Sequence, residues 1–215
     1  MAAGAVFVVV LVSVVAGWMP MVAIDHSVAV AAGRAGDTVP GWTALWATVS
    51  TVLGPTALRV VAVVVVLGWA IARWRRGGAE GHADWHVPLA AATVLIGGIV
   101  PVAVKAVVSR PRPPEALVAA AQSSFPSAHA FAAVVAAGVV VLTVADRGRR
   151  RAVVIAITVA VCALALAVCV ARVALAVHYV SDVVAGAALG GVWVAASALV
   201  WRPVSAWVDG RGRSR

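Results

Sequence analysis

Long apolar runs separated by short polar segments dominate this chain. A helix that crosses the hydrocarbon core of a bilayer needs about 20 mostly apolar residues. Runs of that length or more lie near residues 3–24, 56–74, 87–108, 126–145 and 152–201. Because the last run is long enough for two helices, the pattern predicts an all-α protein, a six-transmembrane-helix bundle forming a single domain over residues 1–215.

The first run has a second interpretation, as a cleaved signal peptide. It lacks the basic segment with which such peptides begin, so we expect a retained helix. The polar residues that follow it lead into GWTALWATVSTVLGP at 41–55, which is typical of a short helix at the outer surface.

Smaller signals refine two of the predicted spans. Pro126 suits the first turn of a helix and Ser124 suits its cap, so we expect the fourth span to begin there. Gly186 and Gly190, four residues apart, predict a face of the last span against which another helix packs closely.

Arginines mark the orientation of the bundle. They follow the second, fourth and sixth predicted spans, as Arg73, Arg75, Arg76, Arg147, Arg149, Arg150, Arg151, Arg202, Arg211, Arg213 and Arg215. Since loops rich in Lys and Arg stay on the cytoplasmic side, we expect these segments and both termini to be cytoplasmic. The loops after the first, third and fifth spans then face outward.

Composition agrees with a membrane protein and excludes other classes. Hydrophobic residues make up 63% of the chain, charged residues 12%, and the mean hydropathy is +1.03. The net charge of +9 does not predict nucleic-acid binding, because the cations gather at span ends instead of lining a groove with aromatic residues. Cys162 and Cys169 lie too far apart along one helix for a disulfide. The bias toward Arg, Ala and Val indicates a GC-rich bacterial genome and hence a bacterial cytoplasmic membrane.

Three polar segments interrupt the outer ends of the spans. They are KAVVSRPRP at 105–113, FPSAH at 125–129 and ARVALAVHYVSD at 171–182. Polar groups at membrane depth are costly and therefore indicate function. The predicted topology brings seven of them to one bilayer face: Lys105, Arg112, Ser127, His129, Arg172, His178 and Asp182.

The cations and the helix start suit a phosphoryl group. Arg112 and Arg172 offer planar forks for phosphate oxygens, and Lys105, the only lysine beside sixteen arginines, offers a compact charge. Backbone amides around Ser127 and Ala128 add oriented donors at the start of a helix.

The histidines suit catalysis. His178 and Asp182 are four residues apart, so on a helix the carboxylate can accept one ring proton and leave the other nitrogen as a nucleophile. His129 then remains to protonate the departing alkoxide. Taken singly, each of these residues also has a structural interpretation, as an interfacial cation, a helix cap or a buried hydrogen bond. The joint spacing favours the functional one.

At these residues the sequence resembles the type 2 phosphatidic acid phosphatase superfamily, whose helical core is shared with vanadium haloperoxidases. The resemblance implies metal-independent hydrolysis of a lipid phosphate through a phosphohistidine. It assigns the nucleophile to His178, its partner to Asp182, the leaving-group acid to His129, and phosphate binding to Lys105, Arg112, Ser127, Ala128 and Arg172. Ala128 stands where the family commonly has glycine, and Ala171 where a serine usually precedes the arginine. Both departures predict altered affinity more than lost activity.

Other functions stay open at this point. We expect no metal and no cofactor, because the only outer carboxylates are the scattered Asp25, Asp37, Glu115 and Asp182. The partners we expect are the bilayer and a lipid phosphate, with phosphatidic acid, phosphatidylglycerol phosphate and undecaprenyl-type diphosphate all possible and the oligomeric state open. A phosphotransferase, or a non-enzymatic protein that binds or transports lipid headgroups, would use the same cations.

Overall fold

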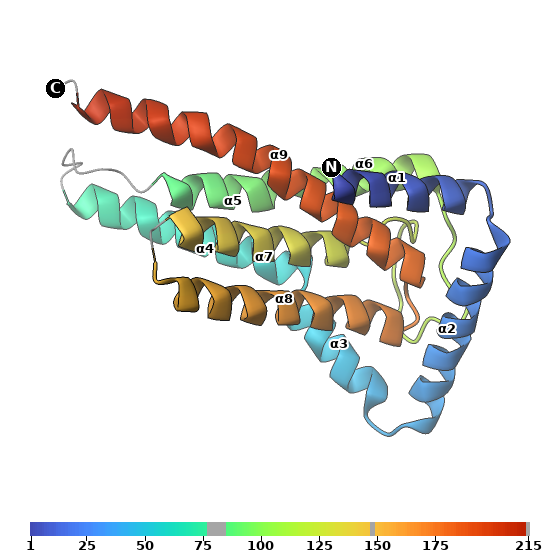
Figure 1. Ribbon diagram of the computed structural model, residues 1–215. Coiled ribbons are helices and arrows are strands. Elements are labelled where there is room, and N and C mark those ends of the chain that lie inside the picture. Colours follow the sequence, from blue (N-terminus) through green and yellow to red (C-terminus); the bar gives the residue numbers. More distant parts are fainter. Residues whose placement is uncertain (77–84, 147–148, 214–215) are drawn as a thin grey trace.

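The chain forms a bundle of helices, seen in a computed structural model that describes residues 1–76, 85–146 and 149–213 (Figure 1). Within that part of the chain there are nine helices and no strand. The helices are α1 (Ala2–Val15), α2 (Met19–Thr38), α3 (Trp42–Val52), α4 (Pro55–Arg75), α5 (His86–Gly97), α6 (Ile99–Val108), α7 (Ala128–Asp146), α8 (Arg151–Ala174) and α9 (Val180–Arg213).

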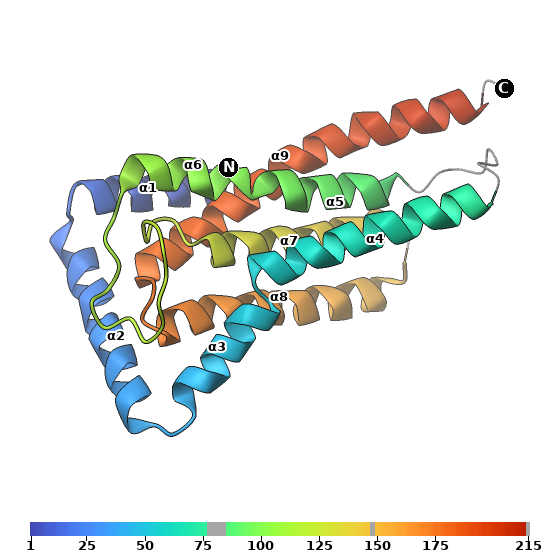
Figure 2. The same cartoon turned by 180° about the vertical axis from the view of Figure 1, so that it is seen from behind.

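Helix α7 forms the centre of the bundle. It packs against α8 and α9, and on its other side against α4 and α5, as the view from behind shows (Figure 2). Phe131 and Val135 of α7 are almost fully buried and form a core cluster with Trp201 of α9. This cluster fixes the depth at which α7 sits in the bundle and therefore the height of its first residues.

The α7–α9 contact depends on small residues. A Cβ atom on Gly186 would lie 2.3 Å from the Ser127 carbonyl oxygen, and one on Gly190 would lie 2.9 Å from the Phe131 carbonyl oxygen. The prediction that these two glycines form a close packing face is confirmed. They let α9 approach the backbone at the start of α7.

In the part of the chain that the structure describes, five helical segments are long and apolar enough to cross a membrane, or six if the bent pair of α1 and α2 counts as one span. The five are Trp42–Arg75, His86–Val108, Ala128–Ala145, Arg151–Ala174 and Val180–Trp201. The all-α transmembrane bundle is therefore confirmed. All five segments coincide with the apolar runs that follow the first one, and the run at 152–201 holds two helices, as predicted. The short outer helix expected over 41–55 is α3, which leads into α4 through Gly54.

The first predicted span differs from the expectation of one straight helix over 3–24. Helix α1 has 14 residues, which is about 21 Å of helix and short of a bilayer's hydrocarbon thickness. The chain then turns at Gly17, whose φ of 63° favours glycine, and α2 starts with Pro20 in its first turn. Together α1 and α2 form a pair bent by 88°.

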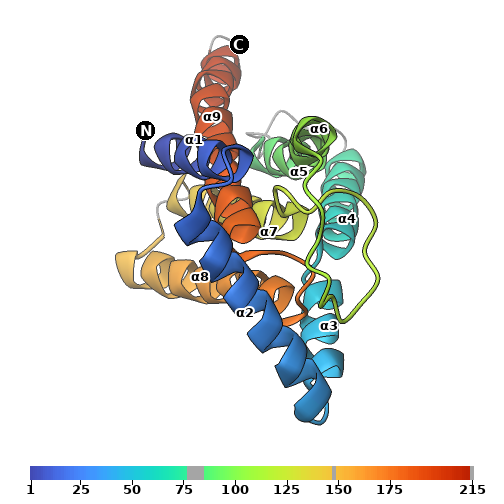
Figure 3. The ribbon, with the colours of Figure 1, turned by 90° about the vertical axis from the view of Figure 1, so that its right-hand side faces the viewer.

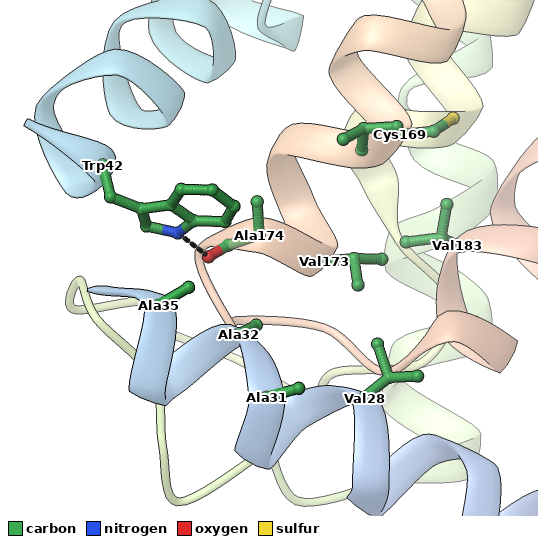
Figure 4. A pocket seen from close by; sticks show the side chains of 10 residues that line it. Val28, Ala31, Ala32, Ala35, Trp42, Cys169, Val173, Ala174 and Val183 are labelled. Atoms are coloured by element: carbon green, nitrogen blue, oxygen red, sulfur yellow. Dashed lines mark hydrogen bonds between the residues drawn. The ribbon is translucent and has the colours of Figure 1, made fainter. Parts of the chain in front are cut away.

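Because of this bend, α2 lies across one end of the bundle (Figures 1 and 3). Trp42, at the start of α3, donates an indole hydrogen bond of 2.8 Å to the Ala174 carbonyl at the end of α8. An apolar groove separates α2 from α8 and α9 below this bond, lined by residues such as Val28, Val173 and Val183 (Figure 4). Helix α2 thus covers the bundle end, with this groove between it and helices α8 and α9.

The arginine-rich helix ends lie at the other end of the bundle from α2, where α4 ends, α8 begins and α9 ends (Figure 1). Arg147 and Arg215, which contributed to the predicted orientation, lie outside the described residues.

Candidate active site

Four helix ends meet beneath α2. Helices α6 and α8 end here and α7 and α9 begin here, joined by the loops 109–127 and 175–179 (Figure 3). The two loops are bound to each other, because the Leu117 amide donates to the Leu175 carbonyl at 3.0 Å. Every candidate residue from the sequence therefore lies at one end of the bundle.

His178 occupies the loop between α8 and α9 and is 2% exposed. Its Nε2 lies 3.3 Å from Nη1 of Arg112, and its Nδ1 lies 3.6 Å from Oδ2 of Asp182. The 3.6 Å between Nδ1 and Asp182 is too long for a hydrogen bond, so Nδ1 is buried without a hydrogen-bond partner. Even so, the nearby carboxylate favours a proton on Nδ1, which leaves the Nε2 lone pair directed at the cations. The sequence placed His178 on a helix with Asp182, whereas α9 begins two residues later, at Val180.

Burial keeps His178 uncharged. It lowers the pKa of His178 from its ordinary value of 6.5 to about 4, although the neighbouring Asp182 carboxylate acts in the opposite direction. At neutral pH the imidazole is therefore neutral, which is the state that a nitrogen nucleophile requires.

Asp182 lies in the first turn of α9 and is fully buried. Its Oδ1 accepts a hydrogen bond of 2.6 Å from Nη1 of Arg110, and its Oδ2 accepts one of 2.9 Å from the Tyr179 amide. A buried carboxylate needs such partners to remain charged. The sequence had left Arg110 without a role.

Arg112 is held by carbonyl groups on both loops. Its Nε donates to Gln122, its Nη2 to Ala121 and its Nη1 to Val177, over 3.1, 3.0 and 2.6 Å. These bonds fix the plane of the guanidinium with Nη1 beside His178. A phosphate at His178 would thus meet a preoriented fork.

The other two cations approach from the helices. Lys105, buried at the end of α6, donates to the Ser123 carbonyl. Arg172, buried at the end of α8, donates from Nη1 to the Ser50 hydroxyl at 2.7 Å, while its Nε is buried without a partner. A buried N–H group in this state is costly unless a ligand binds it. A phosphate oxygen would supply the missing acceptor.

The start of α7 differs in detail from the sequence prediction. The helix begins at Ala128, so Pro126 precedes it instead of filling its first turn. Ser124 is not its cap, because the Ser124 hydroxyl bonds the Arg110 and Pro111 carbonyls. The Ser127 amide is also unavailable as a phosphate donor, since it donates to the Asp182 carbonyl at 2.9 Å.

What remains at the start of α7 is still suited to an anion. The Ser127 side chain is buried. Ala128 and His129 are the first residues of the helix, and backbone amides at a helix start have no acceptor within the helix. His129 lies close enough to His178, Arg172, Arg112 and Lys105 to interact with them electrostatically. The two histidines therefore share one site.

Three residues of this site were missed as site residues by the sequence analysis: Asp25, Arg110 and Ser50. Asp25 and Ser50 lie in α2 and α3, distant in sequence from the three polar segments, and both are buried. The one available signal was a charged residue, Asp25, directly after an apolar run. Among the described residues, no group of three or more His, Cys, Asp or Glu side chains is arranged to hold a metal ion.

Comparisons with known proteins concern the family and the fold of the chain. A family model described as the PAP2 superfamily matches residues 86–205, which include all eight residues predicted to form the site. The fold is similar to the crystal structure of a transmembrane PAP2 type phosphatidylglycerolphosphate phosphatase from Bacillus subtilis, with a TM-score of 0.77 and 20% identity over 94% of this chain and 96% of that chain. A search of curated protein sequences gives no significant match.

Proposed function

This chain belongs to the PAP2 superfamily and is a membrane lipid phosphate phosphohydrolase, and we propose that it acts through a phosphohistidine formed on His178. One observation carries the proposal. His178 is buried and neutral, with Asp182 beside Nδ1 and the Arg112 guanidinium beside Nε2. This is the arrangement of an activated nucleophile between an orienting acid and an anion clamp.

In the first step, the Nε2 lone pair of His178 attacks phosphorus and an N–P bond forms. The bond from phosphorus to the ester oxygen breaks, and that oxygen leaves with the bonding electrons. For a phosphate monoester, His129 gives that oxygen a proton and the lipid departs as an alcohol, whereas a diphosphate releases the lipid as its monophosphate. The positive charge that develops on His178 is stabilised by Asp182.

In the second step, water attacks the phosphohistidine while His129 accepts one of its protons. The N–P bond breaks, the electron pair returns to Nε2, and inorganic phosphate is released. Throughout both steps Lys105, Arg112 and Arg172 bind the phosphoryl oxygens, with Ser127 and the Ala128 amide completing the cradle. Charge stabilisation by preoriented donors is commonly the largest contribution to such catalysis.

The site faces outward in this proposal, and the protein lies in a bacterial cytoplasmic membrane. Support comes from the arginine-rich helix ends, which are at the far end of the bundle from His178 (Figure 1). The substrate is then a lipid phosphate or diphosphate of the outer leaflet. The similar structure is described as a phosphatidylglycerolphosphate phosphatase, so phosphatidylglycerol phosphate is the first substrate to test. Phosphatidic acid and undecaprenyl-type diphosphate come next.

The test is phosphate release by the purified protein from each of these three lipids in mixed micelles, with a metal chelator present. We expect release from at least one of them, and a loss of about 1,000-fold or more in kcat for His178→Ala. No release from any of the three contradicts the assignment. Normal turnover by His178→Ala would instead refute the phosphohistidine.

The role of His129 has its own test. His129→Ala should lose most activity on a lipid phosphate, whose alkoxide is a poor leaving group. It should keep much more on an aryl phosphate whose phenolate leaves without a proton. Equal losses on the two substrates would remove the assignment of His129 as the acid.

A further inference from the structure

A buried ionic cluster lies behind His178, on the side of Asp182 away from the phosphate cations. It consists of Asp25 from α2, Arg110 from the loop after α6, and Ser181 with Asp182 from the first turn of α9. Asp25 and Asp182 are 1% and 0% exposed, so two carboxylates are buried around one guanidinium. The proposed chemistry gives a role to Asp182 alone among these residues.

The Arg110 guanidinium bridges the two carboxylates. Its Nη1 lies 2.6 Å from Oδ1 of Asp182, and its Nη2 lies 2.9 Å from Oδ2 of Asp25. Nη1 also donates to the Ser181 hydroxyl at 2.7 Å. Both nitrogens are thus occupied, and two negative charges offset the positive one. Arg110 is for this reason a poor phosphate ligand, in contrast to Arg112 two residues later.

Asp25 fastens this assembly to α9. Its Oδ1 accepts from the Ser181 amide at 3.0 Å, and its Oδ2 accepts from the Ser181 hydroxyl. The amides in the first turn of a helix have no partner within the helix and favour negative charge. A carboxylate from α2 therefore binds the turn of α9 that carries Asp182.

Arg110 is restrained on its other sides as well. Its guanidinium carbon lies 4.3 Å from the centre of the Tyr179 ring, and that ring contacts His26 of α2 edge to face. The Arg110 carbonyl accepts from the Ser124 amide at 2.9 Å, which ties it to the segment leading into Ser127. Burial opposes its charge, but Asp182 and Asp25 outweigh burial and raise the pKa of Arg110 above its ordinary value.

We propose that Arg110, held by Asp25, is a positioning residue that fixes the Asp182 carboxylate so that its Oδ2 faces Nδ1 of His178. The proposal rests on the proposed function, because it concerns the orientation of the nucleophile. With Oδ1 committed to Arg110 and Oδ2 to the Tyr179 amide, the carboxylate cannot rotate freely about its bond to the rest of the side chain. His178 then meets an acceptor in a fixed place, and catalysis is sensitive to displacements of about 1 Å.

The experiment measures kcat, KM and inhibition by inorganic phosphate for Arg110→Ala, Arg110→Lys and Asp25→Asn. We expect Arg110→Ala to lower kcat by about 10-fold or more while KM and the inhibition constant of phosphate stay within about twofold. Arg110→Lys should recover part of the loss, since one ammonium keeps the charge but lacks the fork that bridges two carboxylates. The matched control is Arg34→Ala, an exposed arginine on α2, which should behave as wild type.

A double variant tests the connection between Asp25 and Arg110. Asp25→Asn alone should lower kcat, whereas in the Arg110→Ala background it should cause no further loss, because it removes a carboxylate that has lost its counter-ion. Additive losses would show that the two residues act independently and would overturn the proposal. Should Arg110→Ala fail to fold, Arg110→Lys and Asp25→Asn decide, each with a lowered kcat and unchanged phosphate inhibition.

Failure of this inference is distinct from failure of the proposed function. If His178→Ala is inactive while the Arg110 and Asp25 variants keep the wild-type kcat, the positioning role is refuted and the phosphatase stands. If Arg110→Ala instead raises both KM and the inhibition constant of phosphate, Arg110 is a phosphate ligand and its positioning role is equally refuted. If the wild-type protein releases no phosphate, the proposed function itself fails.

Discussion

The contact between Gly186 and the start of α7 yields a graded test of how the bundle positions the site. Replacing Gly186 by Ala would put a methyl group 2.3 Å from the Ser127 carbonyl oxygen, with the Ser127 backbone nitrogen and carbonyl carbon both at 3.2 Å. Backbone atoms cannot rotate away as the end of a flexible side chain can. To reach even 3.0 Å, α7 and α9 must separate by about 0.7 Å.

The cost of that separation follows from its position. Overpacking a close contact costs about 1–3 kcal/mol of stability. The same contact between α7 and α9 includes the hydrogen bond from the Ser127 amide to the Asp182 carbonyl. Ser127, His129 and Asp182 would all shift relative to His178. Since a misplacement of about 1 Å can reduce turnover about 100-fold, we expect Gly186→Ala to lower kcat by about 10- to 100-fold.

Two other glycines of α9 provide the controls. Gly190→Ala meets the Phe131 carbonyl oxygen at 2.9 Å and should cause a smaller loss. Gly191→Ala meets only the Ala3 side chain at 3.5 Å, an ordinary contact, and should be neutral or stabilising, because alanine favours a helix over glycine. The assay is phosphate release with thermal unfolding of each variant in detergent. Equal kcat for all three variants, or an order that does not follow these distances, would refute the reasoning.

Two further predictions concern the proposed phosphate site. Burial lowers the pKa of His178 to about 4, so the proposed nucleophile is neutral above that pH, and the acid limb of kcat/KM should fall near pH 4. The measurement uses an aryl phosphate, with the ionisation of the substrate divided out, and an acid limb near pH 6.5 contradicts the prediction. Ser50→Ala should raise KM about 3- to 10-fold with a smaller change in kcat, because it removes the hydroxyl that accepts the 2.7 Å hydrogen bond from Arg172. An unchanged KM would show that Arg172 needs no support from α3. The control is Ser27→Ala, which changes an exposed serine of α2.

Most of the site could be predicted because its residues adjoin the ends of long apolar runs. Lys105, His129, Arg172 and Asp182 each lie within a few residues of a span end, so the topology alone brings them to one side of the membrane. Hydrophobic periodicity is a strong signal in such segments, and the helix ends it predicts hold to within a few residues. Predictions of finer detail were wrong where hydrogen bonds within a loop determine the structure. Ser124, for example, donates to the Arg110 and Pro111 carbonyls instead of capping α7.

The bend after Val15 left a weaker signal, Gly17 followed by Pro20. The apolar run continues through the turn to Ile24, and in a membrane a glycine such as Gly17 is compatible with both a straight helix and a break. Ser50 was missed for a related reason. Its partner Arg172 is 122 residues away, and a single serine in an apolar helix is normally satisfied by its own backbone.

The bend and the ionic cluster have a common consequence. A straight first span over 3–24 would end at the membrane surface and leave Asp25 in a solvated loop, where a carboxylate needs no partner. The 88° turn instead carries α2 across the bundle end, and Asp25 becomes buried against Ser181 and Arg110. A buried carboxylate without a cation is costly, and Arg110 supplies that cation while it also binds Asp182. The part of the fold that the apolar pattern missed is therefore the part that connects α2 to the orientation of the proposed nucleophile.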